Sequence, residues 1–160
     1  MKLAIHQPHY LPWLGYVAKW DAADRFIFLD TVQYEKNGWQ NRNRIKTKDG
    51  PRWVTVPVHA PLGTAIRDVR VDAGQPWAAR HLWAIEHAYA TAPHFGRHHD
   101  ALRAFYARPW DRLAPLAAAS AEWLARALGV ETPIALASDL AVEPPGTEGD
   151  PTARLVALCR

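Results

Sequence analysis

The N-terminal segment constrains this chain most, because an apolar strand there runs straight into two prolines. Residues 3–5 are apolar, and Pro8 and Pro12 follow closely. Proline fixes φ and lacks an N–H donor, so regular structure must stop here. From Trp13 to Trp20, apolar residues recur at helical spacing. We therefore expect a strand, a rigid polar loop and a helix, a layout that presents side chains and backbone N–H groups to a ligand.

Four side chains mark the point where this strand ends: His6, Gln7, His9 and Tyr10. In α/β proteins, ligands bind at the carboxyl edge of a parallel sheet, just before a helix. Histidine exchanges protons near neutral pH, and glutamine can fix a carbonyl or amide by two hydrogen bonds. We expect the chemistry here, with His6 ahead of His9. The alternative is that His6 and Gln7 only satisfy backbone groups under the proline loop.

A second strand is expected over residues 24–30, which completes a βαβ unit with two adjacent parallel strands. Its last residue, Asp30, would then lie near His6. A carboxylate there could orient a histidine tautomer, bind a sugar hydroxyl or hold an ammonium. The alternative is an acid that caps a turn. Gln33 and Tyr34 follow shortly after Asp30 and could line the same side of the site.

Two-residue alternation over residues 38–58, around a Lys-Asp-Gly turn, predicts a β-hairpin. Asn41 and Asn43 would share one face with Trp39, whereas Arg42 and Arg44 would occupy the other. Paired amides suit a sugar or amide ligand, and paired arginines can clamp a phosphate or carboxylate. Only one of the two faces can look at the site.

The rest of the chain predicts alternating elements. Together they indicate an α/β fold in three layers, with a mainly parallel sheet and an inserted hairpin, similar to nucleotidyltransferase and Rossmann-like layouts. Glycine stands where such transferases open their helix, but their two histidines are missing, so phosphate binding fits better than nucleotidyl transfer. The expected elements are a strand over 66–71, helices over 77–89, 98–107 and 110–128, a strand over 133–138, a polar loop over 143–150 and a last helix.

Composition predicts one globular domain spanning residues 1–160, with 49% hydrophobic and 22% charged residues. No apolar run approaches the roughly 20 residues needed to cross a bilayer, so we expect no membrane insertion. Cys159 is the single cysteine and can form no internal disulfide, which fits the cytoplasm. Met1 leads almost directly into the strand, which argues against a signal peptide.

The net charge of +3 is unevenly distributed, because the stretch from Lys36 to Arg52 holds six basic residues and only one acid, Asp49. Such a stretch could bind a nucleotide-sugar, a thioester carrier or a nucleic acid. The candidate site mixes amides and histidines instead of forming a lysine-rich stripe. A nucleic-acid-binding module is therefore an alternative of lower rank.

Histidines and tryptophans offer two further signals. His94 and His98 have the spacing of helical zinc ligands, but Pro93 and Gly96 argue against a helix there. We therefore expect no metal and no cofactor. Of the eight tryptophans, we assign Trp20, Trp83 and Trp123 to the core. We favour the core for Trp13, Trp39 and Trp53 as well, although an indole beside the site could stack on a sugar or base.

Four separated blocks, at residues 6–16, 28–34, 41–46 and 53–58, resemble the WbqC-like family in sequence and in order. This resemblance gives Asn41 and Arg42 the most weight among the hairpin residues. It implies a cytoplasmic biosynthetic step for surface polysaccharide such as O-antigen, or for a related metabolite, on an activated sugar or acyl donor. The resemblance also implies that members usually continue beyond the last helix expected here. We therefore expect either a fragment or a short member.

We therefore predict a metal-independent transferase that acts on a small molecule, which a carrier protein could deliver. We rank transfer of an acyl or aminoacyl group ahead of transfer of a glycosyl or nucleotidyl group. His6 would be the base, Asp30 its partner, and Arg42 a ligand of the developing anion. The alternative is a non-catalytic binding or scaffold protein. No oligomeric state is predicted. The expected substrate-binding residues are Gln7, His9, Tyr10, Gln33, Tyr34, Asn41 and Arg42.

Overall fold

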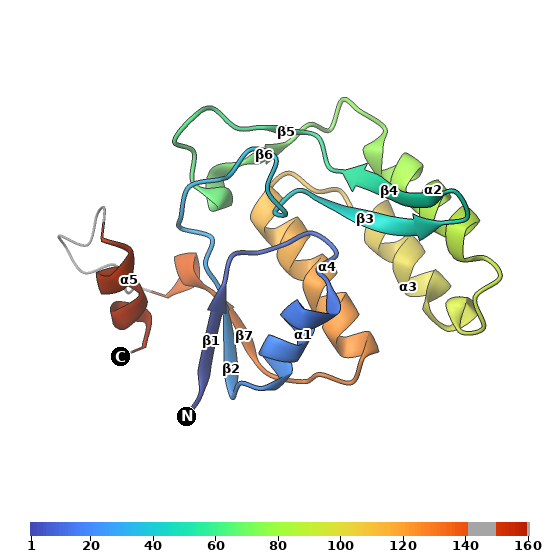
Figure 1. The fold of residues 1–160 in the computed structure, drawn as a ribbon. Helices are drawn as coiled ribbons and strands as arrows, with labels where there is room; N and C mark the ends of the chain where they lie inside the picture. The colour runs from blue at the N-terminus through green and yellow to red at the C-terminus, as the bar shows by residue number, and fades with distance from the viewer. Residues whose placement is uncertain (141–149, 160) are drawn as a thin grey trace.

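A computed structural model describes residues 1–140 and 150–159 (Figure 1). It is an α/β fold in which, within those residues, five α-helices accompany a small parallel sheet. None of these described helices has the length and apolar character that crossing a bilayer requires. The polar loop expected over 143–150 lies outside the described residues except for Asp150. That residue caps the expected last helix, α5 (Pro151–Leu158), by accepting two backbone N–H groups of its first turn.

The sheet confirms the expected βαβ unit. Strand β1 (Leu3–His6) pairs in parallel with β2 (Arg25–Phe28), and helix α1 (Leu14–Asp21) connects them. Strand β7 (Ile134–Leu136) joins the other edge of β2, also in parallel, so the order is β1-β2-β7. This late strand is shorter than expected because Ala137–Asp139 form a 3-10 helix, η2. All three strands therefore end at one edge of the sheet.

One face of this sheet packs against α1 and α4 (Leu113–Ala127), which lie side by side in Figure 1. Phe26 and Phe28 point from β2 into this core and are fully buried. Trp20 stacks on Phe26 with ring centroids 4.7 Å apart, and its indole N–H donates to the carbonyl of Thr132. Truncating a buried aromatic side chain of this kind costs about 3–5 kcal/mol. Trp20 thus belongs to the core, as predicted.

The hairpin is also confirmed. Strands β3 (Arg42–Thr47) and β4 (Gly50–Thr55) pair in antiparallel register around the turn, where Gly50 has a φ of +106° that glycine adopts without strain. Ile45 and Val54 point inward from the two strands and are buried in a second core. The hairpin is a separate two-stranded sheet and does not join the parallel one.

A short ribbon follows the hairpin, made of β5 (Val58–His59) and β6 (Arg70–Val71). The strand expected over 66–71 is therefore wrong over its first half. Residues Ile66–Asp68 form a 3-10 helix, η1. The physical reason is the spacing of Ile66 and Val69, which are three residues apart and both fully buried, as one 3-10 turn allows.

Helices α2 (Trp77–Tyr89) and α3 (Phe95–Ala107) pack on the inner face of the hairpin. The bounds of α2 are those expected, whereas α3 begins three residues earlier than expected. Gly96 lies in the first turn of α3, so it does not prevent a helix there. On α2, Trp83 is 58% exposed, and its assignment to the core was wrong. Trp123, on α4, lies at the margin of this second core.

Candidate functional site

Two imidazoles and two aromatic rings cluster where β1 ends. The ring centroids of His6 and His9 are 4.8 Å apart, and Tyr16 lies 4.7 Å from the first and 5.4 Å from the second. Trp13 completes the cluster at 6.2 Å from His6 and 5.6 Å from His9. The loop turns back at Leu11, whose φ is +45°. The structure thus brings together His6 and His9, as the sequence predicted.

The hydrogen bond of His6 determines which of its nitrogens can act as a base. Nδ1 lies 3.1 Å from the backbone carbonyl oxygen of Gln7, which can only accept. Nδ1 therefore carries the proton, and Nε2 presents a lone pair. Partial burial lowers the pKa of His6, although this hydrogen bond opposes the effect and nearby Lys19 adds to it. The ring is mostly neutral at pH 7.

His9 is more deeply buried, with only 6% of its surface exposed. Burial, with a smaller contribution from His6, lowers the pKa of His9 to about 4. Its Nδ1 atom is buried and has no hydrogen-bond partner among the described residues. A buried polar atom without a partner costs free energy, so a hydroxyl, amide or water that reaches this nitrogen would gain a hydrogen bond.

Gln7 forms a pair with Gln40, a residue that the sequence did not single out. The Gln40 amide N–H donates to Gln7 Oε1 at 2.8 Å. Gln40 is 1% exposed, and its Oε1 atom lacks a partner within the described residues. The pair thus leaves N–H donors on Gln7 and an acceptor on Gln40, a combination that suits a ligand amide or hydroxyl.

The side chain of Tyr10 points away from this cluster. Its hydroxyl contacts Nδ1 of His81 at 2.9 Å and the hydroxyl of Tyr106 at 2.5 Å, inside the second core. Burial raises the pKa of Tyr10 well above its ordinary value. Tyr10 therefore ties the proline loop to α2 and α3. Its expected role in positioning an acceptor stays a prediction, and its contacts support a structural role.

Asp30 is 1% exposed, just beyond the end of β2. Its carboxylate accepts hydrogen bonds from the backbone N–H (2.9 Å) and the hydroxyl (2.6 Å) of Ser138, which follows β7. No hydrogen bond joins it to His6 among the described contacts, and the Gln7 carbonyl orients that imidazole instead. The carboxylate fastens the strand ends together, while a catalytic role for it stays a prediction.

Gln33 and Tyr34 lie on the segment that leads to the hairpin. Gln33 is exposed and forms an isolated bridge with Ala65, whereas Tyr34 donates its backbone N–H to Thr64. Partial burial raises the pKa of Tyr34, and the nearby Arg42 cation partly offsets that effect. No described contact joins either Gln33 or Tyr34 to the histidine cluster.

The two faces of β3 have different roles. Asn41, just before the strand, donates to the carbonyl of Val56, and Asn43 donates to that of Leu11. Both amides thus secure neighbouring loops from the inner face. Arg42 holds the carbonyls of Gly38 and Asn37 on the outer side. The predicted separation of amides and arginines is therefore correct, and Arg44, on the arginine face, is exposed to solvent.

The arginine face carries two exposed indoles. Trp53 is paired with Arg44 across the hairpin, and the guanidinium carbons of Arg42 and Arg44 lie 4.5 and 5.4 Å from its ring centroid. Trp39 packs on Trp53 with centroids 5.4 Å apart. Trp39 therefore belongs to the arginine face and not to the amide face as expected, because the chain between 37 and 41 is a turn that breaks the alternation.

The expectation that three further indoles belong to the core is wrong. Trp13, Trp39 and Trp53 are 49%, 39% and 45% exposed. Counting the strand register outward from the turn places Trp53 opposite Arg44, so this pairing could have been predicted. No pattern in the sequence indicates that Gln40 would pair with Gln7. Exposed indoles beside guanidinium groups can bind a flat ring with attached phosphates.

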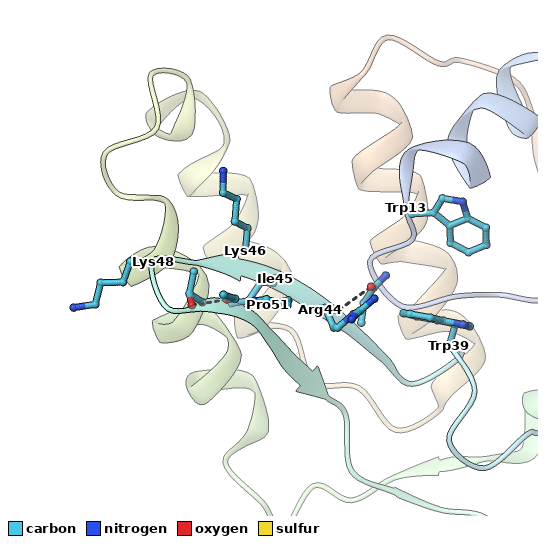
Figure 2. A pocket seen from close by; sticks show the side chains of 10 residues that line it. Trp13, Trp39, Arg44, Ile45, Lys46, Lys48 and Pro51 are labelled. Carbon is cyan, nitrogen blue, oxygen red and sulfur yellow. Dashed lines mark hydrogen bonds between the residues drawn. The ribbon is translucent and has the colours of Figure 1, made fainter.

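A pocket of about 830 Å³ lies along β3 (Figure 2). Trp13 and Trp39 stand at one end, Arg44 lies between, and Lys46 and Lys48 extend toward the turn. Consecutive residues from both faces of β3 line it, so the pocket follows the unpaired edge of the strand. Trp13 is shared with the histidine cluster, which connects the two parts of the site.

Two backbone N–H donors on the unpaired edge of β3 are occupied by side chains. The backbone N–H of Arg44 donates to Oδ1 of Asn43 at 2.8 Å, and that of Lys46 donates to the hydroxyl of Tyr89 at 3.0 Å. A ligand in this pocket therefore meets side chains before it meets free backbone donors.

No metal-holding group of three or more His, Cys, Asp or Glu side chains occurs in the part of the chain that the structure describes. His94 is the residue before α3, and His98 lies within that helix. The neighbouring His99 pairs with Glu86 at 2.7 Å. His99 therefore links α3 to α2.

Comparison with known proteins places the chain in a family and finds a similar protein. The profile of the WbqC-like protein family matches residues 7–160. The protein named "Uncharacterized protein Rv1507c", from Mycobacterium tuberculosis (strain ATCC 25618 / H37Rv), is 43% identical over 107 residues, which are 66% of this chain and 46% of that protein. The match thus covers about half the length of this curated relative. No solved structure matches the chain.

Proposed function

Because this chain belongs to the WbqC-like protein family, we propose that it is a transferase that moves a group from an activated donor to an amine or hydroxyl. An acyl or aminoacyl group ranks before a glycosyl group. The family resemblance supports a cytoplasmic step in the assembly of surface polysaccharide or a related metabolite. The substrate is a small molecule, and a carrier protein is one way to deliver it.

One observation carries this proposal: the Gln7 carbonyl holds the Nδ1 proton of His6. The Nε2 lone pair can therefore take a proton from an attacking amine or hydroxyl as the new bond forms. Burial keeps the ring neutral at pH 7, which a general base requires. General base catalysis of this kind contributes about 10²–10⁴-fold in rate.

The remaining groups divide between acceptor and donor. His9 Nδ1 and the Gln7–Gln40 pair offer unpartnered polar atoms that can position an acceptor beside His6. Arg44 and Lys46 line the adjoining pocket and can neutralise a phosphate-bearing donor. The site lies at the carboxyl ends of the parallel strands, which is where Rossmann-like and nucleotidyltransferase-like proteins bind their ligands. The proposal therefore includes a three-layer fold of this kind.

A screen tests the proposal. Nucleotide-sugars, acyl thioesters and amino acids are tested first for a shift in thermal unfolding and then, in donor and acceptor pairs, for product by mass spectrometry. His6→Gln should lower turnover at least about 100-fold. His87→Gln, on the exposed side of α2, is the matched control and should leave it unchanged. Stabilisation without product would show a non-catalytic binding protein, and full turnover by His6→Gln would exclude His6 as the base.

The indole and arginine face of the hairpin favours a second candidate, binding of single-stranded nucleic acid. Trp39 and Trp53 could stack on bases while Arg42 and Arg44 meet phosphates. Titration with RNA and DNA oligonucleotides at rising salt tests it. A steep loss of affinity with salt, together with a loss on Trp53→Ala, would support this function. The site at His6 has no part in it, which ranks it second.

A further inference from the structure

A second hollow, strongly apolar, lies next to the pocket along β3. It is a groove of about 520 Å³ between the proline loop, the ends of α2 and α4, and the start of α3. Its apolar lining includes Leu11, Leu14, Tyr89, Phe95, Trp123 and Leu128. Leu14 is 73% exposed and Leu128 is 55% exposed, so this apolar surface is open to solvent. A groove of this kind binds alkyl or aromatic ligands by the hydrophobic effect.

The groove and the pocket meet at β3. Arg44 and Ile45 line both. The groove adds no lysine or carboxylate of its own, while the pocket adds Lys46 and Lys48. A ligand that crosses Arg44 would therefore have an apolar end on one side and an anionic end on the other.

The occupant is better matched by a lipid-like chain than by a peptide strand. A peptide that extends the sheet needs free backbone N–H groups, and those of Arg44 and Lys46 are donated to Asn43 and Tyr89. An alkyl chain needs no hydrogen bonds. The exposed indole of Trp39, which lines the pocket, suits a flat heterocycle.

We propose that this site binds an acyl thioester whose acyl chain lies in the apolar groove and whose phosphate-bearing head lies in the β3 pocket. Coenzyme A and the phosphopantetheine arm of a carrier protein share this chemistry. Binding of the thioester is argued from the groove and the pocket alone. Its role as the donor rests on the proposed transferase function. In that role, the acceptor nitrogen attacks the thioester carbonyl, the C–N bond forms and the C–S bond breaks. His6 takes the amine proton and returns it to the departing thiolate.

The experiment measures binding by calorimetry without an acceptor. The probes are coenzyme A, its butyryl, hexanoyl, octanoyl and decanoyl thioesters, and free octanoate. We expect the Kd to fall by about two- to fourfold for each added methylene until the groove is filled. Octanoyl-coenzyme A should thus bind at least about tenfold tighter than coenzyme A. Free octanoate should bind weakly, and acyl phosphopantetheine without the nucleotide should show whether the adenine end contributes.

Two groove variants and one matched control locate the effect. Leu14→Gln and Leu128→Gln replace exposed leucines, so both should fold. Each should reduce the affinity ratio between octanoyl-coenzyme A and coenzyme A by about fivefold. Leu62→Gln changes a leucine that is 98% exposed and lies outside the groove, and the ratio should not change. Arg44→Gln should weaken every coenzyme A probe, because it removes a cation from the pocket that holds the phosphates.

Equal affinity for coenzyme A and octanoyl-coenzyme A would overturn the inference, as would a chain-length gain that persists in both groove variants. Failure of the transferase function is a separate result. A chain-length gain without acyl transfer to any amine or hydroxyl would retain the acyl-binding site and reject the transferase. Transfer of a short acyl group without a chain-length gain would retain the transferase and reject the acyl-binding groove.

Discussion

The indole of Trp13 occupies the space that a β-carbon on Gly15 would need, with Nε1 only 2.7 Å from that position. Glycine at 15 therefore lets the indole fold over the first turn of α1 and reach the histidine cluster. Gly15→Ala should displace the indole while improving the intrinsic helix propensity of α1 by up to about 1 kcal/mol. We expect unchanged or higher stability together with at least about a tenfold loss of activity or ligand affinity.

Gly96→Ala is the matched control for this prediction. Gly96 is the second residue of α3, as Gly15 is of α1, and a β-carbon there would meet nothing within 4 Å. It should stabilise the protein without changing activity. Tryptophan fluorescence and the near-ultraviolet circular dichroism spectrum report the indole directly. An unchanged spectrum in Gly15→Ala would show that the indole does not depend on glycine.

Acid should destabilise the protein through its buried imidazoles. The pKa of His9 and that of His81 are each lowered to about 4, chiefly by burial. Unfolded histidine titrates near 6.5, so between these values the unfolded chain binds more protons and stability falls as the pH falls. With about two protons taken up near pH 5, the slope should approach about 3 kcal/mol per pH unit.

Urea unfolding between pH 7 and 5 measures this slope, above the range where most carboxylates titrate. His81→Gln should remove about one proton from the uptake even if it lowers stability overall. A free energy of unfolding that stays constant from pH 6.5 to 5 would contradict the burial of both rings.

Substitutions at Asp30 separate a structural carboxylate from a catalytic one. Asp30→Ala removes both acceptors of Ser138 and should destabilise the protein by about 2–4 kcal/mol. Asp30→Asn can still accept the Ser138 N–H and donate to its hydroxyl, so it should fold with a smaller loss. Activity within a few-fold of the parent in Asp30→Asn would assign the residue to the fold. A loss of about 100-fold or more with the fold intact would give its charge a part in the reaction.

The hydroxyl of Tyr10 is shared by His81 and Tyr106, which makes the three residues interdependent. Tyr10→Phe and Tyr106→Phe should each cost about 1–3 kcal/mol, because each leaves a buried polar group without a partner. The double variant should cost less than the sum. Denaturant unfolding of the four proteins of this cycle measures the coupling, and strict additivity would show that the short contact contributes no coupling energy.

Local rules predicted most of the fold. Proline at 8 and 12, the apolar runs of β1 and β2, and the alternation around Gly50 determine the βαβ unit and the hairpin. Gly129, at a φ of +82°, ends α4 as expected. The failures occurred where tertiary contacts decide, as at Ile66, which belongs to a 3-10 turn because its neighbours bury it.

The candidate site was predictable only in part. His6 and His9 follow from a strand that stops at a sheet edge, and the structure places them together. The direction of the Tyr10 side chain depends on α2 and α3, which lie far along the chain, so no local pattern could give it. The Gln7–Gln40 pair and the contact of Asp30 with Ser138 likewise join residues 33 and 108 positions apart.

The two closed backbone donors on β3 have a consequence for the protein in a crowded cell. An edge strand with free N–H groups is a template on which other chains can add strands and aggregate. Asn43 and Tyr89 occupy the donors of Arg44 and Lys46. These two donors are therefore withheld from any strand that could add to this flank of the ribbon, while the flank stays open to small ligands.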